Sequence, residues 1–94
     1  MKLRQIEVFH AVMITGSTVA AAEMLNVTQP AISTTLKRMQ DELGLALFVS
    51  SSGRLNPTPE ARALFAQVHA IQEDVGSLQR LARLLAEGKA GALR

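Results

Sequence analysis

The sequence predicts a mostly α-helical fold, built from three short helices, a small β-hairpin and one long helix. Apolar residues recur at three- and four-residue spacing in separate segments, as on the buried stripe of an amphipathic helix. Residues that cap helices stand just before three of these segments, and a run of small polar residues interrupts the pattern near residue 50. A length of 94 residues suits one small domain with an appendage.

The first predicted helix spans residues 3–14. Its apolar stripe consists of Ile6, Phe9 and Met13, with charged residues and a histidine off that stripe. Gly16 can end the helix in a left-handed conformation, which glycine adopts without steric cost.

The second predicted helix is short and spans residues 19–25. Ser17 and Thr18 can both cap it. Its three consecutive alanines are strong helix formers, and their small side chains let another helix approach closely. Asn26 suits the following turn because asparagine tolerates a left-handed backbone.

Thr28 can cap a third helix that ends at Gly44. Pro30 falls in its first turn, where the missing N–H breaks no intrahelical bond. One side of this helix carries an apolar stripe of Ile32, Leu36, Met39 and Leu43. The opposite side carries Pro30, Ser33, Thr34, Lys37, Arg38 and Asp41.

The stretch from Leu45 to Leu55 is predicted to form a small β-hairpin. Apolar residues begin its first strand, and residues 50–53 form a turn of small polar residues. Arg54 starts the return strand.

Thr58, Pro59 and Glu60 predict the start of a long helix, as its cap, its first residue and an acid at the positive end of its dipole. Apart from Gly76, no strong breaker follows before Gly88. A helix of about 28 residues would be about 42 Å long. Its apolar stripe keeps heptad spacing through Ala61, Leu64, Val68, Ile71, Val75, Leu78, Ala82 and Leu85.

This stripe is longer than the preceding small domain can cover, so its remainder requires a partner helix. A twofold pair of identical chains would hide the same patch on both. The predicted dimer contacts are Leu64, Val68, Ile71, Val75, Leu78, Leu81, Ala82 and Leu85.

Composition excludes several classes of protein. There is no cysteine, and therefore neither a disulfide framework nor a thiolate metal site. Three phenylalanines are the only aromatic residues, too few for the stacking platforms of a single-strand binder. The apolar runs are far shorter than the roughly 20 residues that span a bilayer. We expect a cytoplasmic protein with no membrane partner. The net charge of +2 is weak support for a nucleic-acid partner.

No set of residues predicts an enzyme or a bound cofactor in this fragment. The serines at 50–52 lack a His and Asp partner set for nucleophilic catalysis. His10 and His69 lie on different predicted helices with no cysteine or second histidine nearby, so no metal site is expected.

A short alanine-rich helix, a tight turn and a helix with a polar outer face together predict a helix-turn-helix. The major groove of B-DNA admits one α-helix, and the base edges there present hydrogen-bond donors and acceptors. Ser33 and Thr34 are short enough to let the backbone come close, and Gln29 can bond an adenine edge. Lys37 and Arg38 can pair with phosphate or guanine. Capped helix N-termini offer backbone N–H groups to phosphate.

The predicted DNA contacts are Ser17, Thr18, Thr28, Gln29, Pro30, Ser33, Thr34, Lys37, Arg38 and Arg54. Most surface helices carry such residues and touch no DNA, so an alternative is a helical assembly domain without a DNA role. Retention on heparin or DNA, compared with a Lys37/Arg38 double alanine variant, discriminates the two.

Specific runs of residues resemble LysR-type transcriptional regulators of bacteria. These runs are residues 3–9, 15–17, 20–25, 27–33, 42–44, 47–48 and 57–61. The resemblance covers essentially the whole chain. The run Thr28-Gln29-Pro30-Ala31-Ile32-Ser33, at this distance from Gly16-Ser17 and Ala20-Ala21-Ala22, is highly specific.

The resemblance implies a winged helix-turn-helix over residues 1–57, whose recognition helix enters the major groove. It implies a dimerising linker helix over residues 58–88, paired antiparallel with its mate on a palindromic site. Residues 89–94 would lead to an effector domain that binds a small-molecule inducer, and the full-length protein would be a dimer or a tetramer.

Three departures from the family pattern concern the DNA contacts. Thr18-Val19 stands where the family has a large apolar residue followed by Thr or Ser. Thr34 stands where the family often has Arg, which weakens a guanine contact. Only Arg54 remains of the arginines common in the wing, so weaker phosphate binding is expected there.

Overall fold

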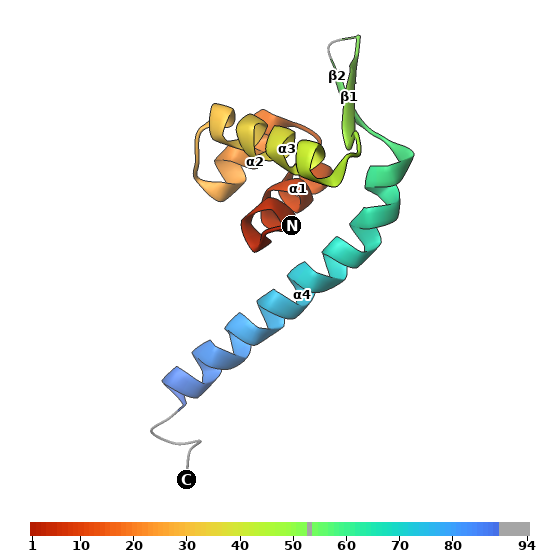
Figure 1. Cartoon of the computed structure of the whole chain (residues 1–94). Helices are drawn as coiled ribbons and strands as arrows, with labels where there is room; N and C mark the ends of the chain where they lie inside the picture. Colours follow the sequence, from red (N-terminus) through yellow and green to blue (C-terminus); the bar gives the residue numbers. More distant parts are fainter. Residues whose placement is uncertain (53, 89–94) are drawn as a thin grey trace.

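A computed structural model describes residues 1–52 and 54–88. The helices and strands of this part follow in the order α1 (Leu3–Thr15), α2 (Thr18–Leu25), α3 (Gln29–Leu43), β1 (Phe48–Ser51), β2 (Arg54–Pro57) and α4 (Pro59–Glu87). In Figure 1, α1–α3 form a cluster, the hairpin projects from it, and α4 runs on as a single long rod. We call α1–α3 with the hairpin the head. The predicted linker at residues 89–94, and Gly53 of the predicted turn, lie outside the described residues.

The predicted caps set the ends of the short helices. Gly16 ends α1 with φ +84°. Ser17 alone caps α2, because its Oγ accepts a hydrogen bond from the Ala20 N–H at 3.0 Å. Thr18 is the first helical residue, so α2 starts one residue earlier than predicted. Thr28 caps α3 as predicted, and its Oγ1 accepts from the Ala31 N–H at 3.3 Å.

The core lies where α1 meets α2, α3 and α4. Phe9 and Leu47 are completely buried there. Of the predicted stripe of α3, Ile32, Leu36 and Met39 are buried and Leu43 packs partly against the core. Val8 and Val12 are buried as well, although the predicted stripe of α1 omitted them. The stripe was too narrow because a helix packed against three others needs a wider apolar surface.

Gln5 is a buried polar side chain that joins the ends of two helices. Its Oε1 accepts from the Lys2 N–H at 2.9 Å, and its Nε2 donates to the Glu42 carboxylate at 3.0 Å. Both ends of the amide are therefore paired, as a buried polar group requires.

The hairpin is displaced toward the C-terminus relative to its predicted limits. Its register pairs Phe48 with Pro57, so strand β1 starts three residues after Leu45, and the return strand runs beyond Leu55. The reason is the Gln40 side chain, whose Oε1 accepts from the N–H groups of Leu47 at 2.7 Å and Phe48 at 3.1 Å. These bonds direct Leu47 into the core before the strand begins.

Thr58 joins the hairpin to α4. Its Oγ1 accepts from the Ala61 N–H at 3.1 Å, as the predicted cap, and donates to the Ala46 carbonyl at 2.7 Å. Its own N–H donates to the Leu47 carbonyl at 2.9 Å. The start of α4 is thereby fixed to the segment that enters β1.

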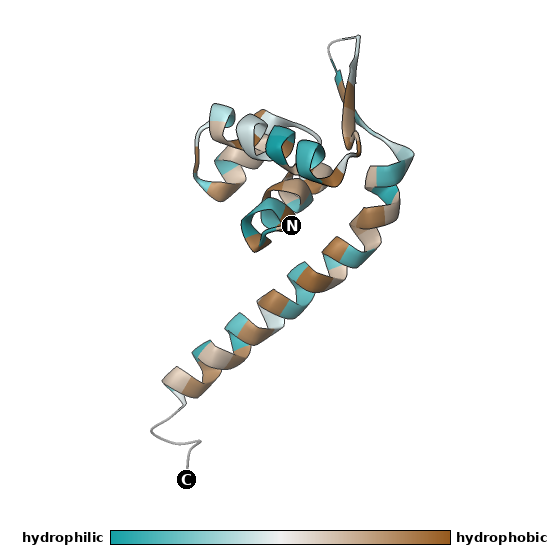
Figure 2. Ribbon diagram, viewed as in Figure 1, coloured by the Kyte–Doolittle hydropathy of each residue, from teal (hydrophilic) through white to brown (hydrophobic). Residues whose placement is uncertain are grey.

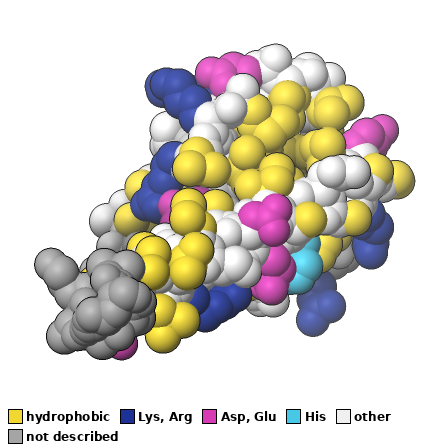
Figure 3. Space-filling view, turned by 90° about the horizontal axis from the view of Figure 1, so that it is seen from below, with side chains coloured by type: hydrophobic (Ala, Val, Ile, Leu, Met, Phe, Trp, Pro, Cys, Tyr) yellow, Lys and Arg dark blue, Asp and Glu magenta, His cyan; other side chains and the backbone are white. Residues whose placement is uncertain are grey.

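Only the first part of α4 packs against the head. Ala61 and Val68 are buried in the core, and Leu64 packs partly against it. Beyond Val68, most of the apolar stripe is exposed, with 39% of Ile71 and 65% of Leu78 accessible, while Val75 is half-buried. Hydrophobic residues recur along the whole rod in Figure 2 and lie uncovered toward its C-terminal end in Figure 3.

Two residues of the predicted dimer surface also pack against the head. Val68 is 4% exposed and has almost no surface left for a partner, and Leu64 also packs against its own head. Leu64 and Val68 share the heptad spacing of the later residues because a single apolar stripe runs along α4. The first part of that stripe packs against the core. None of the helices in the described residues is long and apolar enough to cross a bilayer.

Candidate nucleic-acid interface

The outer face of α3 is open to solvent. Gln29, Pro30, Ser33, Thr34 and Lys37 are all exposed, as is Arg38, while Ile32, Leu36 and Met39 point into the core. Thr28 is exposed at the helix start, where its hydroxyl is engaged as the cap. The predicted contact residues of α3 therefore share one accessible surface.

Gln29 is held by two hydroxyl groups. Its Nε2 donates to Thr18 Oγ1 at 3.1 Å and to Ser33 Oγ at 3.2 Å. An amide nitrogen has two hydrogens, so both donors are engaged, and Oε1 remains as an acceptor. The predicted bidentate contact with adenine needs a free N–H. In this arrangement Gln29 instead presents an acceptor, which favours a base edge that donates.

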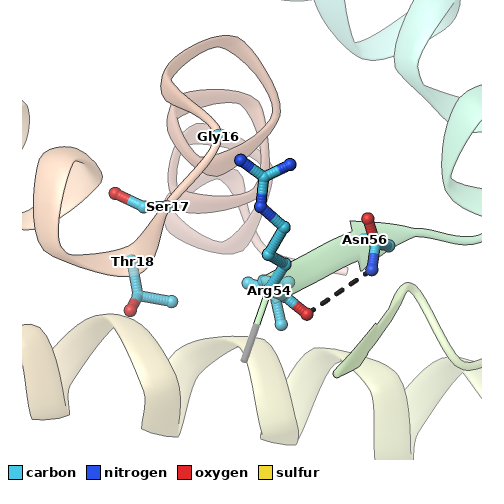
Figure 4. A pocket seen from close by; sticks show the side chains of 6 residues that line it. Gly16, Ser17, Thr18, Arg54 and Asn56 are labelled. Carbon is cyan, nitrogen blue, oxygen red and sulfur yellow. Dashed lines mark hydrogen bonds between the residues drawn. The ribbon is translucent and has the colours of Figure 1, made fainter. Parts of the chain in front are cut away.

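A groove separates the start of α2 from the hairpin. Gly16, Ser17, Thr18, Arg54 and Asn56, with Leu55, line an open volume of ≈ 470 Å³. Figure 4 shows the Arg54 guanidinium pointing toward the turn between α1 and α2. Asn56 Nδ2 donates to the Arg54 carbonyl at 3.5 Å. A guanidinium beside a helix N-terminus makes this groove suited to a phosphate group.

The charges on α3 are unequal. Lys37 Nζ lies 3.5 Å from the Asp41 carboxylate, which partly neutralises it. Neither Arg38 nor Arg54 has an ion-pair partner among the described residues. Arg38 lines a hollow of ≈ 190 Å³ with Thr34, Thr35, Gln5 and the basic residues Lys2 and Arg4. The two arginines are therefore better placed than Lys37 to meet an anion.

The structure divides the predicted contacts into neighbouring sets. Gln29 contacts both Thr18 and Ser33, and Ser17 and Thr18 share the groove with Arg54. Thr34, Lys37 and Arg38 line a further hollow beside them. Thr28 and Pro30 lie at the exposed start of α3, where the Thr28 hydroxyl caps the helix.

Sequence reasoning missed the positions of Lys2 and Arg4 beside Arg38. It also missed a pair of histidines, because it found no second histidine near either of them. His10 Nε2 and His69 Nδ1 lie 3.0 Å apart, although 58 residues separate them along the chain. Only the packing of α4 against α1 brings them together, and no motif signals it.

Comparisons with known proteins agree with this geometry. Residues 3–62 match the family described as "Bacterial regulatory helix-turn-helix protein, lysR family". The regulatory protein NocR of Agrobacterium fabrum is 38% identical over 97% of this chain and 30% of its own length. The transcriptional activator protein LysR of Escherichia coli is 39% identical over 99% of this chain and 30% of its own. The chain thus spans about a third of the length of these relatives.

Two solved structures with similar folds contain DNA. The DNA-binding domain of BenM, in complex with the catB site 1 DNA, has a TM-score of 0.81 and 27% identity, covering 94% of this chain and 98% of its own. The DNA-binding domain of CbnR, in complex with DNA, has a TM-score of 0.75 and 30% identity over 92% of this chain and 99% of its own.

Proposed function

This chain belongs to the lysR family of bacterial regulatory helix-turn-helix proteins, and from that premise we propose that it binds double-stranded DNA sequence-specifically as part of a transcription regulator. The observation that carries the proposal is the exposed polar face of α3, flanked by the groove that Arg54 enters. A helix of this kind fits the major groove, and the flanking groove can take a backbone phosphate. The BenM and CbnR domains, which share the fold, were solved with DNA.

In this proposal, the residues of α3 divide between bases and phosphates. Ser33 and Thr34 face base edges, with Gln29 and Pro30 at the entrance to the groove. Phosphates are bound by Lys37, Arg38 and Arg54, assisted by the helix starts at Ser17, Thr18 and Thr28. The unpaired guanidinium groups of Arg38 and Arg54 support this division.

We also propose that the chain acts as a homodimer. The exposed part of the α4 stripe supports a pair of α4 helices that presents two recognition helices to a palindromic site. The contacts would come from Ile71, Val75, Leu78, Leu81, Ala82 and Leu85, of which Ile71, Leu78, Leu81 and Leu85 are exposed large hydrophobic residues. In a full-length cytoplasmic regulator, residues 1–57 would read DNA and residues 58–88 would link them to an inducer-binding domain, in a dimer or a tetramer.

Selection of bound duplexes from a random pool tests the proposed function. A palindromic consensus with two half-sites is expected, because a twofold dimer binds two equal half-sites. Replacing Ser33 by alanine should cost about 1–3 kcal/mol on that consensus and little on random DNA. Ser77→Ala, on α4 beyond the head, is the matched control and should bind as the parent does. A pool that yields no enriched sequence would refute sequence-specific binding.

The competing proposal is a helical assembly domain that has no DNA role. Its support is the same exposed stripe on α4. Salt-dependent retention on DNA separates the two, because only a DNA-binding protein should lose retention when Lys37 and Arg38 are both replaced by alanine.

A further inference from the structure

The histidine pair lies where α4 leaves the head. Val68 is the last residue of α4 in the core, and His69 follows it directly. On the facing helix α1, His10 is half-buried, and its Nε2 shares a hydrogen bond with His69 Nδ1 at 3.0 Å. Two imidazole rings from distant parts of the chain therefore meet at the edge of the interface between α1 and α4.

Aromatic packing holds both rings in place. The Phe65 ring, which packs partly against the core, stacks on His10 with centroids 5.6 Å apart and planes at 14°. The His10 and His69 rings are stacked at 5.2 Å and 23°, and Phe65 also meets His69 at 5.5 Å. The fold thus holds the two nitrogens close together.

We propose that His10 and His69 form a two-histidine site for a divalent transition-metal ion of the Zn²⁺, Ni²⁺ or Cu²⁺ type. With metal–nitrogen bonds of about 2.0–2.1 Å, two imidazoles on one ion lie about 2.9–3.4 Å apart at bond angles of about 90–109°. The observed separation of 3.0 Å falls within this range. The described residues hold no group of three or more potential ligands, so water completes the coordination.

The environment of His10 suits a metal. A histidine binds metal through its neutral imidazole. Burial lowers the pKa of His10, the neighbouring His69 lowers it further, and Glu73 acts in the opposite direction. His10 therefore stays neutral at lower pH than a free histidine does. The Glu73 carboxylate, one turn beyond His69 on α4, also attracts a cation. Figure 3 shows histidine and acidic side chains side by side on this face.

The ligand type selects the ion. Two imidazoles and water suit borderline ions and discriminate against Mg²⁺ and Ca²⁺, which prefer oxygen ligands. Among divalent ions, affinity for a nitrogen site rises to a maximum at Cu²⁺. When an ion binds, the ring that carries the proton between Nε2 of His10 and Nδ1 of His69 takes it up on its other nitrogen, so both imidazoles stay neutral ligands. The ion would then join α1 to α4 at the point where α4 leaves the head.

Titration calorimetry with CuCl2, NiCl2 and ZnCl2, on the whole 94-residue chain, tests this proposal. We expect one ion per chain, with Cu²⁺ bound most tightly and MgCl2 giving no binding heat. His10→Ala and His69→Ala should each weaken binding at least tenfold, because each removes one of two protein ligands. The electron paramagnetic resonance spectrum of the Cu²⁺ form should show coupling to two imidazole nitrogens in the parent and to fewer in either variant.

Controls keep the outcome independent of folding and of DNA binding. His69 is exposed, so His69→Ala should fold, and far-UV circular dichroism checks this for both variants. Glu73→Gln keeps both imidazoles and should bind the ion with a smaller loss than either histidine variant. If the parent binds none of the three ions, or if both histidine variants bind as the parent does, the site does not exist. Neither result depends on the proposed DNA-binding function.

Discussion

At the scale of single residues, Thr18 links the two helices of the helix-turn-helix. Its hydroxyl accepts from Gln29, which also donates to Ser33 on the next turn of α3. A large apolar residue at position 18 would offer no such acceptor. Thr18 is therefore better understood as positioning Gln29 than as a phosphate ligand alone.

Replacing Thr18 by valine should broaden base preference at the position that Gln29 reads. Valine keeps the shape of threonine but removes the acceptor, so the amide of Gln29 becomes free to rotate. The expected loss of discrimination is about 0.5–1.5 kcal/mol, the net worth of one hydrogen bond. Binding of each single-base variant of the selected site measures it. Thr18→Ser should keep the preference, and an unchanged profile for valine would refute the positioning role.

Replacing Arg54 by alanine should weaken binding equally on specific and random DNA. A phosphate contact carries no sequence information, and its loss lowers the magnitude of the log–log salt slope by about 0.9 per contact per subunit. Binding measured over a range of salt concentrations gives this slope. Arg83→Ala, near the far end of α4, is the control. A slope that Arg54→Ala leaves unchanged would remove the hairpin from the interface.

At the scale of elements, Gln40 sets the start of the hairpin. Its side chain accepts the N–H groups of Leu47, directly before β1, and of Phe48, the first residue of β1. A sequence pattern can place a strand near apolar residues, but it does not show which side chain competes for the backbone. This competition is why the helices, whose caps lie next to them in sequence, were predicted more accurately than the hairpin.

Gln40→Ala should destabilise the head by about 1–3 kcal/mol, because it leaves the N–H groups of Leu47 and Phe48 without a partner. Urea unfolding followed by circular dichroism measures the change. Gln40→Glu keeps an acceptor on a side chain of the same length, so it should lose clearly less stability than Gln40→Ala. Equal losses in the two variants would show that the hydrogen bonds are not the cause.

Glycine disfavours the interior of a helix, yet α4 continues through Gly76. Gly76→Ala should raise helix stability by about 1 kcal/mol. A β-carbon there would meet Arg80 Nη1 at 3.3 Å, and the end of that flexible side chain can move away. Thermal unfolding measures the gain in stability, and sedimentation equilibrium of the same variant measures the strength of the dimer. A weaker dimer would contradict a purely local effect and would show that a partner helix approaches closely at Gly76.

At the scale of the whole molecule, one stripe on α4 serves two purposes. Its first part closes the core through Ala61 and Val68, and its later part stays exposed. Heptad spacing is the same in both parts. Periodicity therefore predicted the stripe, but it did not predict the residue at which the stripe leaves the core. The His10–His69 pair lies at that point and escaped prediction for the same reason, since it depends on how α4 crosses α1.

The double variant Val75→Asp/Leu78→Asp should be monomeric where the parent is a dimer. Two buried carboxylates facing their symmetry mates would be repelled and desolvated at the centre of the pair. Sedimentation equilibrium at high micromolar concentration measures the molecular mass. Ser77→Asp, between them in sequence, adds a charge outside the stripe and should stay dimeric. A monomeric parent, or a double variant that stays dimeric, would defeat the proposed dimer.

The hydrogen bonds of Thr58 affect where such regulators can be divided to make chimaeric proteins. Thr58 ties the hairpin to α4, and Ala61 and Val68 complete the core. A boundary at residue 57 would separate DNA reading from dimerisation, yet it would cut through the folding unit. An exchangeable module for chimaeric regulators should therefore extend through His69, so that the grafted part carries its own core and only the exposed rod is swapped.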